Sequence, residues 1–219
     1  MRKYLPVLQH SAFFSDIEGE SLLAMLGCLS IHVVSYKQHE YAFHQGDSIK
    51  KIGLVLTGAL QLEREDLDGN RTILDKLLPG ASFGEAIVCS RQSVLPNSVV
   101  ARSDCEVMYM DYDKILHTCS NSCSFHNHLI ENMIAVLARR NVYLTNKLDF
   151  LSRRSTREKL LAYLRSEQIT QQTNPITIHF TRQELADFLS VDRSAMSMEL
   201  SKLQKDGIIK YKKNTFWLD

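Results

Sequence analysis

The sequence contains little of what marks secreted or membrane-inserted proteins. Its 219 residues include only five cysteines and four prolines, and nowhere do 18 apolar residues follow one another. An odd number of scattered cysteines does not build a disulfide framework, which indicates reduced thiols. Arg2 and Lys3 stand near the start, but the apolar stretch of a secretory signal does not follow them. We therefore expect a cytoplasmic protein without a membrane partner.

The motifs of common enzymes are also missing. The sequence has no glycine-rich phosphate loop, no nucleophile elbow and no HExxH zinc motif, so we expect no catalytic activity. Its charge is unevenly distributed. Residues 1–151 hold 14 basic and 17 acidic residues, whereas residues 152–219 hold 12 basic and 8 acidic ones. A basic segment on a mildly acidic body favours a polyanionic partner for the C-terminal part.

Between residues 30 and 113, short apolar segments alternate with turn residues. Segments rich in valine, isoleucine and leucine are separated by Gly58, Asp68-Gly69-Asn70 and Pro79-Gly80. Repeated short strands at this spacing predict a sandwich or barrel, such as a jelly roll.

A heptad pattern follows Cys123. Its members stand alternately four and three residues apart, and they are Ile130, Ile134, Leu137, Asn141, Leu144, Leu148 and Leu151. This spacing predicts a two-stranded parallel coiled coil and hence a homodimer, in which the single polar Asn141 sets the register. The alternative is a long helix that packs on its own domain.

Residues 181–205 carry the pattern of a helix-turn-helix. Thr181 and Glu184 form a capping box, Ser190 and Val191 form the turn, and Asp192 caps a second helix. In such a motif the second helix enters the major groove of DNA, and its first residues contact base edges. The alternative is a helical hairpin that binds protein.

The expected DNA contacts lie on both helices and on a basic turn between two short strands, residues 208–211 and 215–218. In the first turn of the second helix, the guanidinium of Arg193 matches the two acceptors of a guanine. The expected contact residues are Arg182, Gln183, Arg193, Ser194, Ser197, Met198, Lys202 and Lys212.

The whole chain resembles the CRP/FNR family of bacterial transcription regulators. Phe43-His44-Gln45-Gly46-Asp47, Leu56-Thr57-Gly58-Ala59-Leu60 and Pro79-Gly80-Ala81-Ser82-Phe83-Gly84-Glu85 look like the glycine-punctuated strands of the family's β-roll. Residues 181–184 and 193–203 resemble its DNA-binding motif. Two positions depart from the pattern. Met198 stands where many relatives have arginine, and Ser190 stands where they usually have glycine.

The resemblance implies an α+β fold in three parts. Residues 1–124 would form an effector-sensing, cyclic-nucleotide-binding-like β-roll (a jelly roll), residues 125–151 a dimerisation helix, and residues 152–219 a winged helix-turn-helix domain. The implied function is a sequence-specific transcription regulator controlled by a small-molecule effector. Its partners would be an inverted-repeat operator in double-stranded DNA, a second copy of the chain, and RNA polymerase.

The resemblance places the effector pocket at Gly84, Glu85, Leu95, Pro96 and Asn141. Cyclic-AMP-binding relatives hold the phosphate with an Arg-Ser pair, whereas Leu95-Pro96 stands at that place here. Because nothing there neutralises a buried phosphate, we expect that cyclic AMP is not the effector. Glu85 would accept from hydroxyl groups of the ligand, or it would be a structural acid bound to backbone N–H groups. Asn141 would touch both the ligand and the partner subunit.

Cysteine ligands would provide two further sensing modes. Residues 1–27 contain no cysteine, so the N-terminal iron–sulfur cluster of FNR-type members is not expected. Cys119, Cys123 and His126 offer an alternative, a metal- or redox-responsive regulator, but their spacing fits no standard zinc module. A last alternative is a sensor module that acts through protein contacts without DNA.

Overall fold

The computed structural model describes residues 1–66, 68–69, 71–92, 94–116 and 124–218. Its contacts group the chain into two compact units. The first consists of Met1–Asn70 with Leu74–Arg140, and the second of Arg71–Ile73 with Asn141–Asp219. Helix α5 (Ser124–Leu151) supplies residues to both units. The domain limits expected from the sequence therefore stay predictions. None of the described helices is long and apolar enough to span a membrane.

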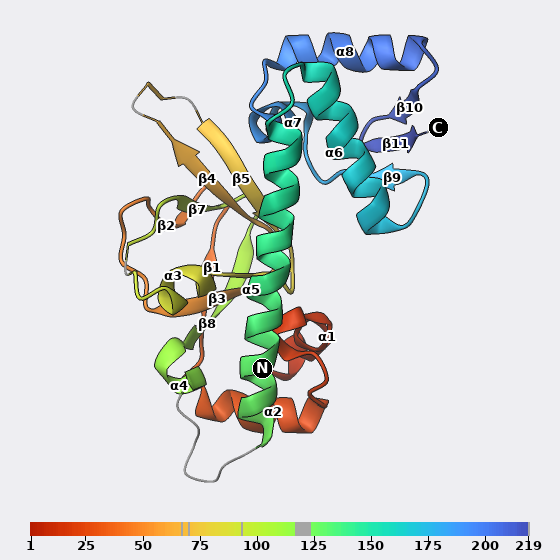
Figure 1. The fold of residues 1–219 in the computed structure, drawn as a ribbon. Helices are drawn as coiled ribbons and strands as arrows, with labels where there is room; N and C mark the ends of the chain where they lie inside the picture. The colour runs from red at the N-terminus through yellow and green to blue at the C-terminus, as the bar shows by residue number, and fades with distance from the viewer. Residues whose placement is uncertain (67, 70, 93, 117–123, 219) are drawn as a thin grey trace. The chain divides into compact units, whose positions relative to one another are not determined.

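The first unit is a sandwich of two four-stranded sheets with helices around it (Figure 1). One sheet has the order β1-β8-β3-β6 and the other β2-β7-β4-β5. Its elements are α1 (Leu5–His10), α2 (Gly19–Cys28), β1 (His32–Tyr36), β2 (Tyr41–Phe43), β3 (Lys51–Thr57), β4 (Leu60–Glu65), β5 (Arg71–Leu77), β6 (Ser82–Phe83), α3 (Glu85–Cys89), β7 (Ser98–Ala101), β8 (Cys105–Asp111) and α4 (Tyr112–Leu116). The sandwich predicted from the short strands, and the β-roll implied by the family resemblance, are confirmed.

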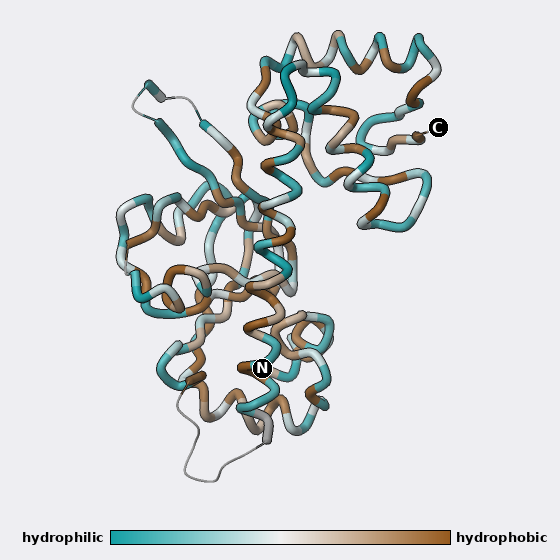
Figure 2. Tube along the Cα trace, in the orientation of Figure 1, coloured by the Kyte–Doolittle hydropathy of each residue, from teal (hydrophilic) through white to brown (hydrophobic). Residues whose placement is uncertain are grey.

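The central strands β3 and β8 are apolar on both faces because both faces are covered. Val55 and Val107 are fully buried, and so are Met108 and Leu54 on neighbouring positions. They share one core cluster with Leu8 of α1. Figure 2 shows this as hydrophobic stretches in the strands, while hydrophobic and hydrophilic residues alternate along α5.

The second unit is a small helical domain with a three-stranded sheet, β10-β11-β9. Besides the end of α5 it contains α6 (Thr156–Gln171), β9 (Ile176–Thr177), α7 (Arg182–Leu189), α8 (Arg193–Lys205), β10 (Ile209–Lys212) and β11 (Thr215–Leu218). Its core includes Leu160, Leu164, Leu185, Phe188 and Leu200. The winged helix-turn-helix fold is confirmed.

Candidate DNA-binding and effector sites

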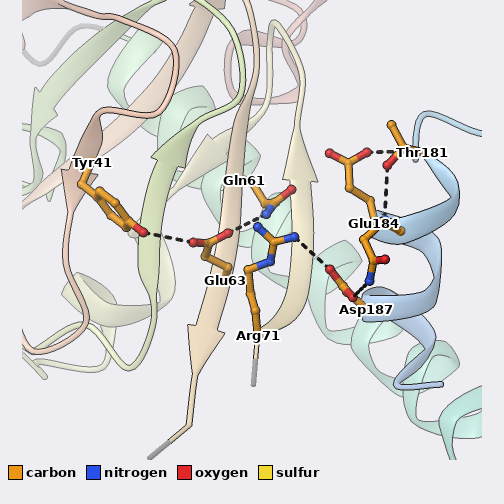
Figure 3. A network of polar contacts seen from close by, with 8 residues as sticks. Tyr41, Gln61, Glu63, Arg71, Thr181, Glu184 and Asp187 are labelled. Atoms are coloured by element: carbon orange, nitrogen blue, oxygen red, sulfur yellow. Dashed lines mark hydrogen bonds and ion pairs between the residues drawn. The ribbon is translucent and has the colours of Figure 1, made fainter. Parts of the chain in front are cut away.

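Helix α7 starts at the capping box that the sequence predicts. The N–H of Glu184 donates to the Thr181 hydroxyl at 3.3 Å, and the N–H of Thr181 donates to the Glu184 carboxylate at 2.7 Å (Figure 3). Two N–H groups that would otherwise lack partners at the helix start are thus satisfied by side chains. This fixes the residue at which α7 begins.

The turn between α7 and α8 passes through Ser190, which adopts the left-handed conformation with φ 52°. Glycine adopts this conformation without strain, whereas a residue with a Cβ pays about 1 kcal/mol. Asp192 then caps α8, since its carboxylate accepts from the N–H of Ala195 at 2.8 Å. The serine that departs from the family pattern therefore occupies the position where glycine is preferred.

The predicted contact residues of α8 differ in whether they already form hydrogen bonds or ion pairs within the protein. Arg193, Ser194 and Met198 are exposed, and no ion pair of Arg193 occurs within the described part of the chain. The Ser197 hydroxyl donates a hydrogen bond to the carbonyl of Arg193 at 2.9 Å, so in this conformation it has no hydrogen left to donate to DNA. Lys202 pairs with Glu199 at 2.7 Å. Arg193 is the cation that the first turn of α8 presents to solvent.

The predicted contact residues of α7 are engaged within the protein. Arg182 donates to the carbonyl of Lys213 at 2.7 Å, and its guanidinium lies 5.1 Å from the ring of Tyr211. Burial lowers the pKa of this arginine. Gln183 donates to Asp187 at 2.7 Å. Arg182 thus ties the wing to α7, and its contact with DNA stays a prediction.

The wing itself presents its lysines to solvent. Lys212 ends β10 and is exposed, and Lys213 follows it with φ 53° in the β10–β11 turn. The two strands expected from the sequence are present, but the first spans residues 209–212 instead of 208–211. Lys212 therefore ends the strand and pairs with Thr215 instead of lying in the turn.

In the first unit, Glu85 opens α3 and is almost completely buried, with 4% of its surface exposed. Gly84 precedes it with φ 87°, a conformation that favours glycine. Among the described residues, no hydrogen bond reaches the Oε2 atom of Glu85. Burial raises the pKa of this carboxyl, while its own backbone N–H, Arg140 and Ser82 act in the opposite direction.

Two charged residues near Glu85 were missed by the sequence analysis. Arg140 of α5 pairs with Asp75 of β5 at 2.8 Å, and both are largely buried in the first unit. The charge of Arg140 lowers the pKa of Glu85, and the charge of Asp75 raises it. No local pattern could have found this pair, because its members are far apart in the sequence and Arg140 lies outside the heptad positions.

Leu95 and Pro96, which the resemblance places where cyclic-AMP-binding relatives hold the phosphate, are structural residues here. Leu95 is buried, its N–H donates to the carbonyl of Asp47, and its own carbonyl accepts from Gly46, both at 2.9 Å. Pro96 is exposed and has no N–H to donate. Neither residue offers a cation. Asn141 belongs to the second unit, and its role in the pocket stays a prediction.

Helix α5 has one apolar face that the chain covers and another that it does not. Leu129, Met133 and Phe150 are buried. On the heptad positions, by contrast, Ile134, Leu144 and Leu148 are 59%, 48% and 68% exposed. Asn141 is exposed among them, and Ile130, Leu137 and Leu151 are half-buried. The face that packs within the chain is therefore not the heptad face, which disfavours the alternative of a helix packed through that seam.

Cys119 and Cys123 lie outside the described residues. His126 is described and is 1% exposed. No group of three or more potential metal ligands occurs within the described ranges.

Comparison with known proteins adds independent findings. A model of the cyclic nucleotide-binding domain matches residues 33–122, and a model of the Crp-like helix-turn-helix domain matches residues 158–219. The chain is 28% identical over 178 residues to the cyclic AMP receptor protein of Thermus thermophilus, covering 80% of this chain and 78% of the relative. It is 25% identical over 195 residues to the transcriptional activator protein FnrL of Cereibacter sphaeroides, covering 80% and 71%.

Solved structures share the fold. A mutant of CooA from Carboxydothermus hydrogenoformans superimposes with a TM-score of 0.74 over 98% of this chain and 90% of its own. Its sequence identity is 17%, so this likeness concerns the fold alone.

Proposed function

Because this chain belongs to the CRP/FNR family of transcription regulators, we propose that it binds duplex DNA sequence-specifically as a homodimer under the control of a small-molecule effector. The observation that carries the proposal is Arg193, exposed and outside any described ion pair in the first turn of α8. Its planar fork matches the O6 and N7 acceptors of guanine in the major groove.

The exposed seam of α5 supports the dimer. Leucine and isoleucine side chains at heptad positions favour a second helix, because that helix would remove their apolar surface from water. A two-fold dimer presents two copies of α8, so the operator is an inverted repeat with half-sites about 34 Å apart. RNA polymerase is proposed as the further protein partner, and the cytoplasm as the location, in keeping with a transcription regulator.

The effector pocket centres on Glu85. A buried carboxylate oxygen without a donor is costly, and a ligand hydroxyl or amine would remove that cost. Arg140 is engaged by Asp75, so the region offers two carboxylates and one paired guanidinium. We therefore propose an effector that donates hydrogen bonds and carries no phosphate, which excludes cyclic AMP.

Selection from randomised duplexes tests the DNA-binding proposal. The purified full-length protein should enrich one inverted repeat, and its affinity should fall as salt rises because bound cations are released from phosphates. Failure to enrich any sequence over random duplex at about 100 mM salt would contradict the proposal. Native mass spectrometry of the same preparation would show a co-purified effector as added mass.

A further inference from the structure

A second cavity lies in the first unit, at the edge of the sandwich. Its volume is about 460 Å³, within the range of roughly 300–1,000 Å³ typical of small-molecule sites. It opens between β1 and β2, which are edge strands of the two sheets. Its lining includes His32, Tyr36, Phe43, Lys50, Lys51 and Tyr109. None of these residues belongs to the effector pocket predicted at Glu85.

Aromatic rings form the walls of this cavity. The rings of His32 and Tyr109 stack with centroids 5.3 Å apart at 22°. Phe43 meets Tyr109 edge-on at 6.0 Å, and it meets Phe83 edge-on at 6.4 Å. Phe83 in turn lies against Gly53, where any Cβ would collide with its ring. Each of these rings packs against another ring, which fixes its orientation. Walls made of fixed aromatic rings suit a flat aromatic molecule, because such a molecule can stack on them or meet them edge-on.

Two hydroxyl groups provide a polar contact inside the cavity. The hydroxyls of Tyr36 and Tyr109 lie 2.8 Å apart. One hydrogen is used between them, so the other is available to a bound acceptor. Tyr109 is buried and Tyr36 only half-buried, so the Tyr36 hydroxyl is the more accessible of the two. Burial raises the pKa of both groups, so both stay protonated at neutral pH.

The mouth of the cavity is positively charged. Lys50 and Lys51 are exposed, and neither forms an ion pair with any described residue. Burial and the neighbouring Lys51 lower the pKa of His32, so this ring is neutral at pH 7. Asp111 stands opposite Lys51 in the β3–β8 register, and its carboxylate keeps its charge although it accepts a hydrogen bond from the N–H of Asp113 at 3.0 Å. Two lysines against one carboxylate leave the mouth with a net positive charge, which attracts an anion.

We propose that this cavity binds a planar aromatic acid. The ring lies among His32, Phe43 and Tyr109, the carboxylate meets Lys50 and Lys51, and the Tyr36 hydroxyl donates to a ring substituent or to the acid itself. This site is positively charged, whereas in the proposed effector pocket the Glu85 carboxylate would accept a hydrogen bond from the ligand. The two sites would therefore select different ligands.

Calorimetric titration of the full-length protein with 2-naphthoate tests this site. The matched probe is 2-naphthalenemethanol, which has the same ring system without the charge. We expect 2-naphthoate to bind once per chain and at least about ten-fold more tightly than the alcohol, because charge-assisted contacts are the stronger ones. The double variant Lys50→Met with Lys51→Met should remove that difference and leave the alcohol's affinity unchanged.

Two control variants locate the binding. Lys37→Met changes an exposed lysine outside the lining, one that pairs with Asp104 at 2.8 Å, and should leave both affinities unchanged. Glu85→Gln changes the proposed effector pocket and should also leave the affinities for 2-naphthoate and 2-naphthalenemethanol unchanged. Equal affinities for the acid and the alcohol would overturn the proposal. Binding of the acid that is lost in Glu85→Gln but kept in the double lysine variant would also overturn it.

Discussion

The guanidinium of Arg71 lies 2.9 Å from the carboxylate of Asp187, and both residues belong to the second unit (Figure 3). A second contact supports it. The ammonium of Lys147 donates to the carbonyl of Ile73 at 3.1 Å and lies 3.7 Å from the centre of the Phe188 ring. Ile73 itself is fully buried in the core of this unit. Three residues of a β-strand thus belong to the helical domain's packing.

A double-mutant cycle on Arg71→Ala and Asp187→Ala should show coupling of about 0.5–1 kcal/mol in the free energy of unfolding, because the pair is only partly exposed. Urea denaturation measures it. The matched control is the pair of Arg153 and Asp149, which lie 2.8 Å apart. Their side chains are 48% and 63% exposed, against 37% and 14% for Arg71 and Asp187, so their coupling should be smaller. Equal coupling in both cycles would show that the lower exposure of Arg71 and Asp187 does not strengthen their ion pair.

Arg193→Ala should cost on the order of 1–3 kcal/mol in DNA affinity and relax preference at one base pair per half-site. Lys212→Ala should weaken all sequences alike and lower the salt dependence by about one ion. Binding-site selection with each variant separates the two roles. An unchanged sequence preference in Arg193→Ala would mean that this residue contacts only phosphate.

Leu148→Asn should weaken the dimer, because it puts an amide at an exposed apolar position of the seam. Asn141→Leu should strengthen association while loosening its register or stoichiometry. Sedimentation velocity at micromolar concentration reports both effects. Ile169→Asn is the control, since Ile169 of α6 is 77% exposed but outside the seam. A wild-type protein that sediments as a monomer would contradict the dimer.

Glu85→Gln should stabilise the ligand-free protein at neutral pH by roughly 1 kcal/mol, because it removes a buried charge with an unpaired oxygen. The folded state raises the pKa of Glu85, so it holds the proton more tightly than the unfolded chain does. Stability contributed by this group is therefore lost as pH rises above the ordinary glutamate range. The difference in Tm between variant and wild type should grow from pH 4 to pH 7, and a constant difference would refute the assignment.

Cyclic AMP should show no calorimetric heat of binding at micromolar to sub-millimolar concentration. Leu95 and Pro96 supply no cation for its phosphate, and Arg140 is held by Asp75. The Asp75→Ala variant would free Arg140 and should raise the affinity for phosphate-bearing ligands. A micromolar dissociation constant for the wild type would place the clamp elsewhere.

Features built from neighbouring residues could be predicted from the sequence. The capping box of Thr181 and Glu184 and the cap at Asp192 each join residues three apart, so the sequence contains both partners in a recognisable spacing. The pair of Asp75 and Arg140 could not be predicted, because it depends on how β5 and α5 pack. The aromatic cavity likewise unites β1, β2 and β8, whose residues carry no common local motif.

Helix α8 has one face that is buried and another that is exposed to solvent. Met196, Leu200 and Leu203 are buried and pack the helix against the domain, whereas Arg193 and Met198 are exposed to solvent. The cap at Asp192 fixes the helix start independently of either exposed side chain. We therefore expect substitutions at residues 193 and 198 to leave the fold intact, and under the proposed function such single substitutions change which operator the domain prefers.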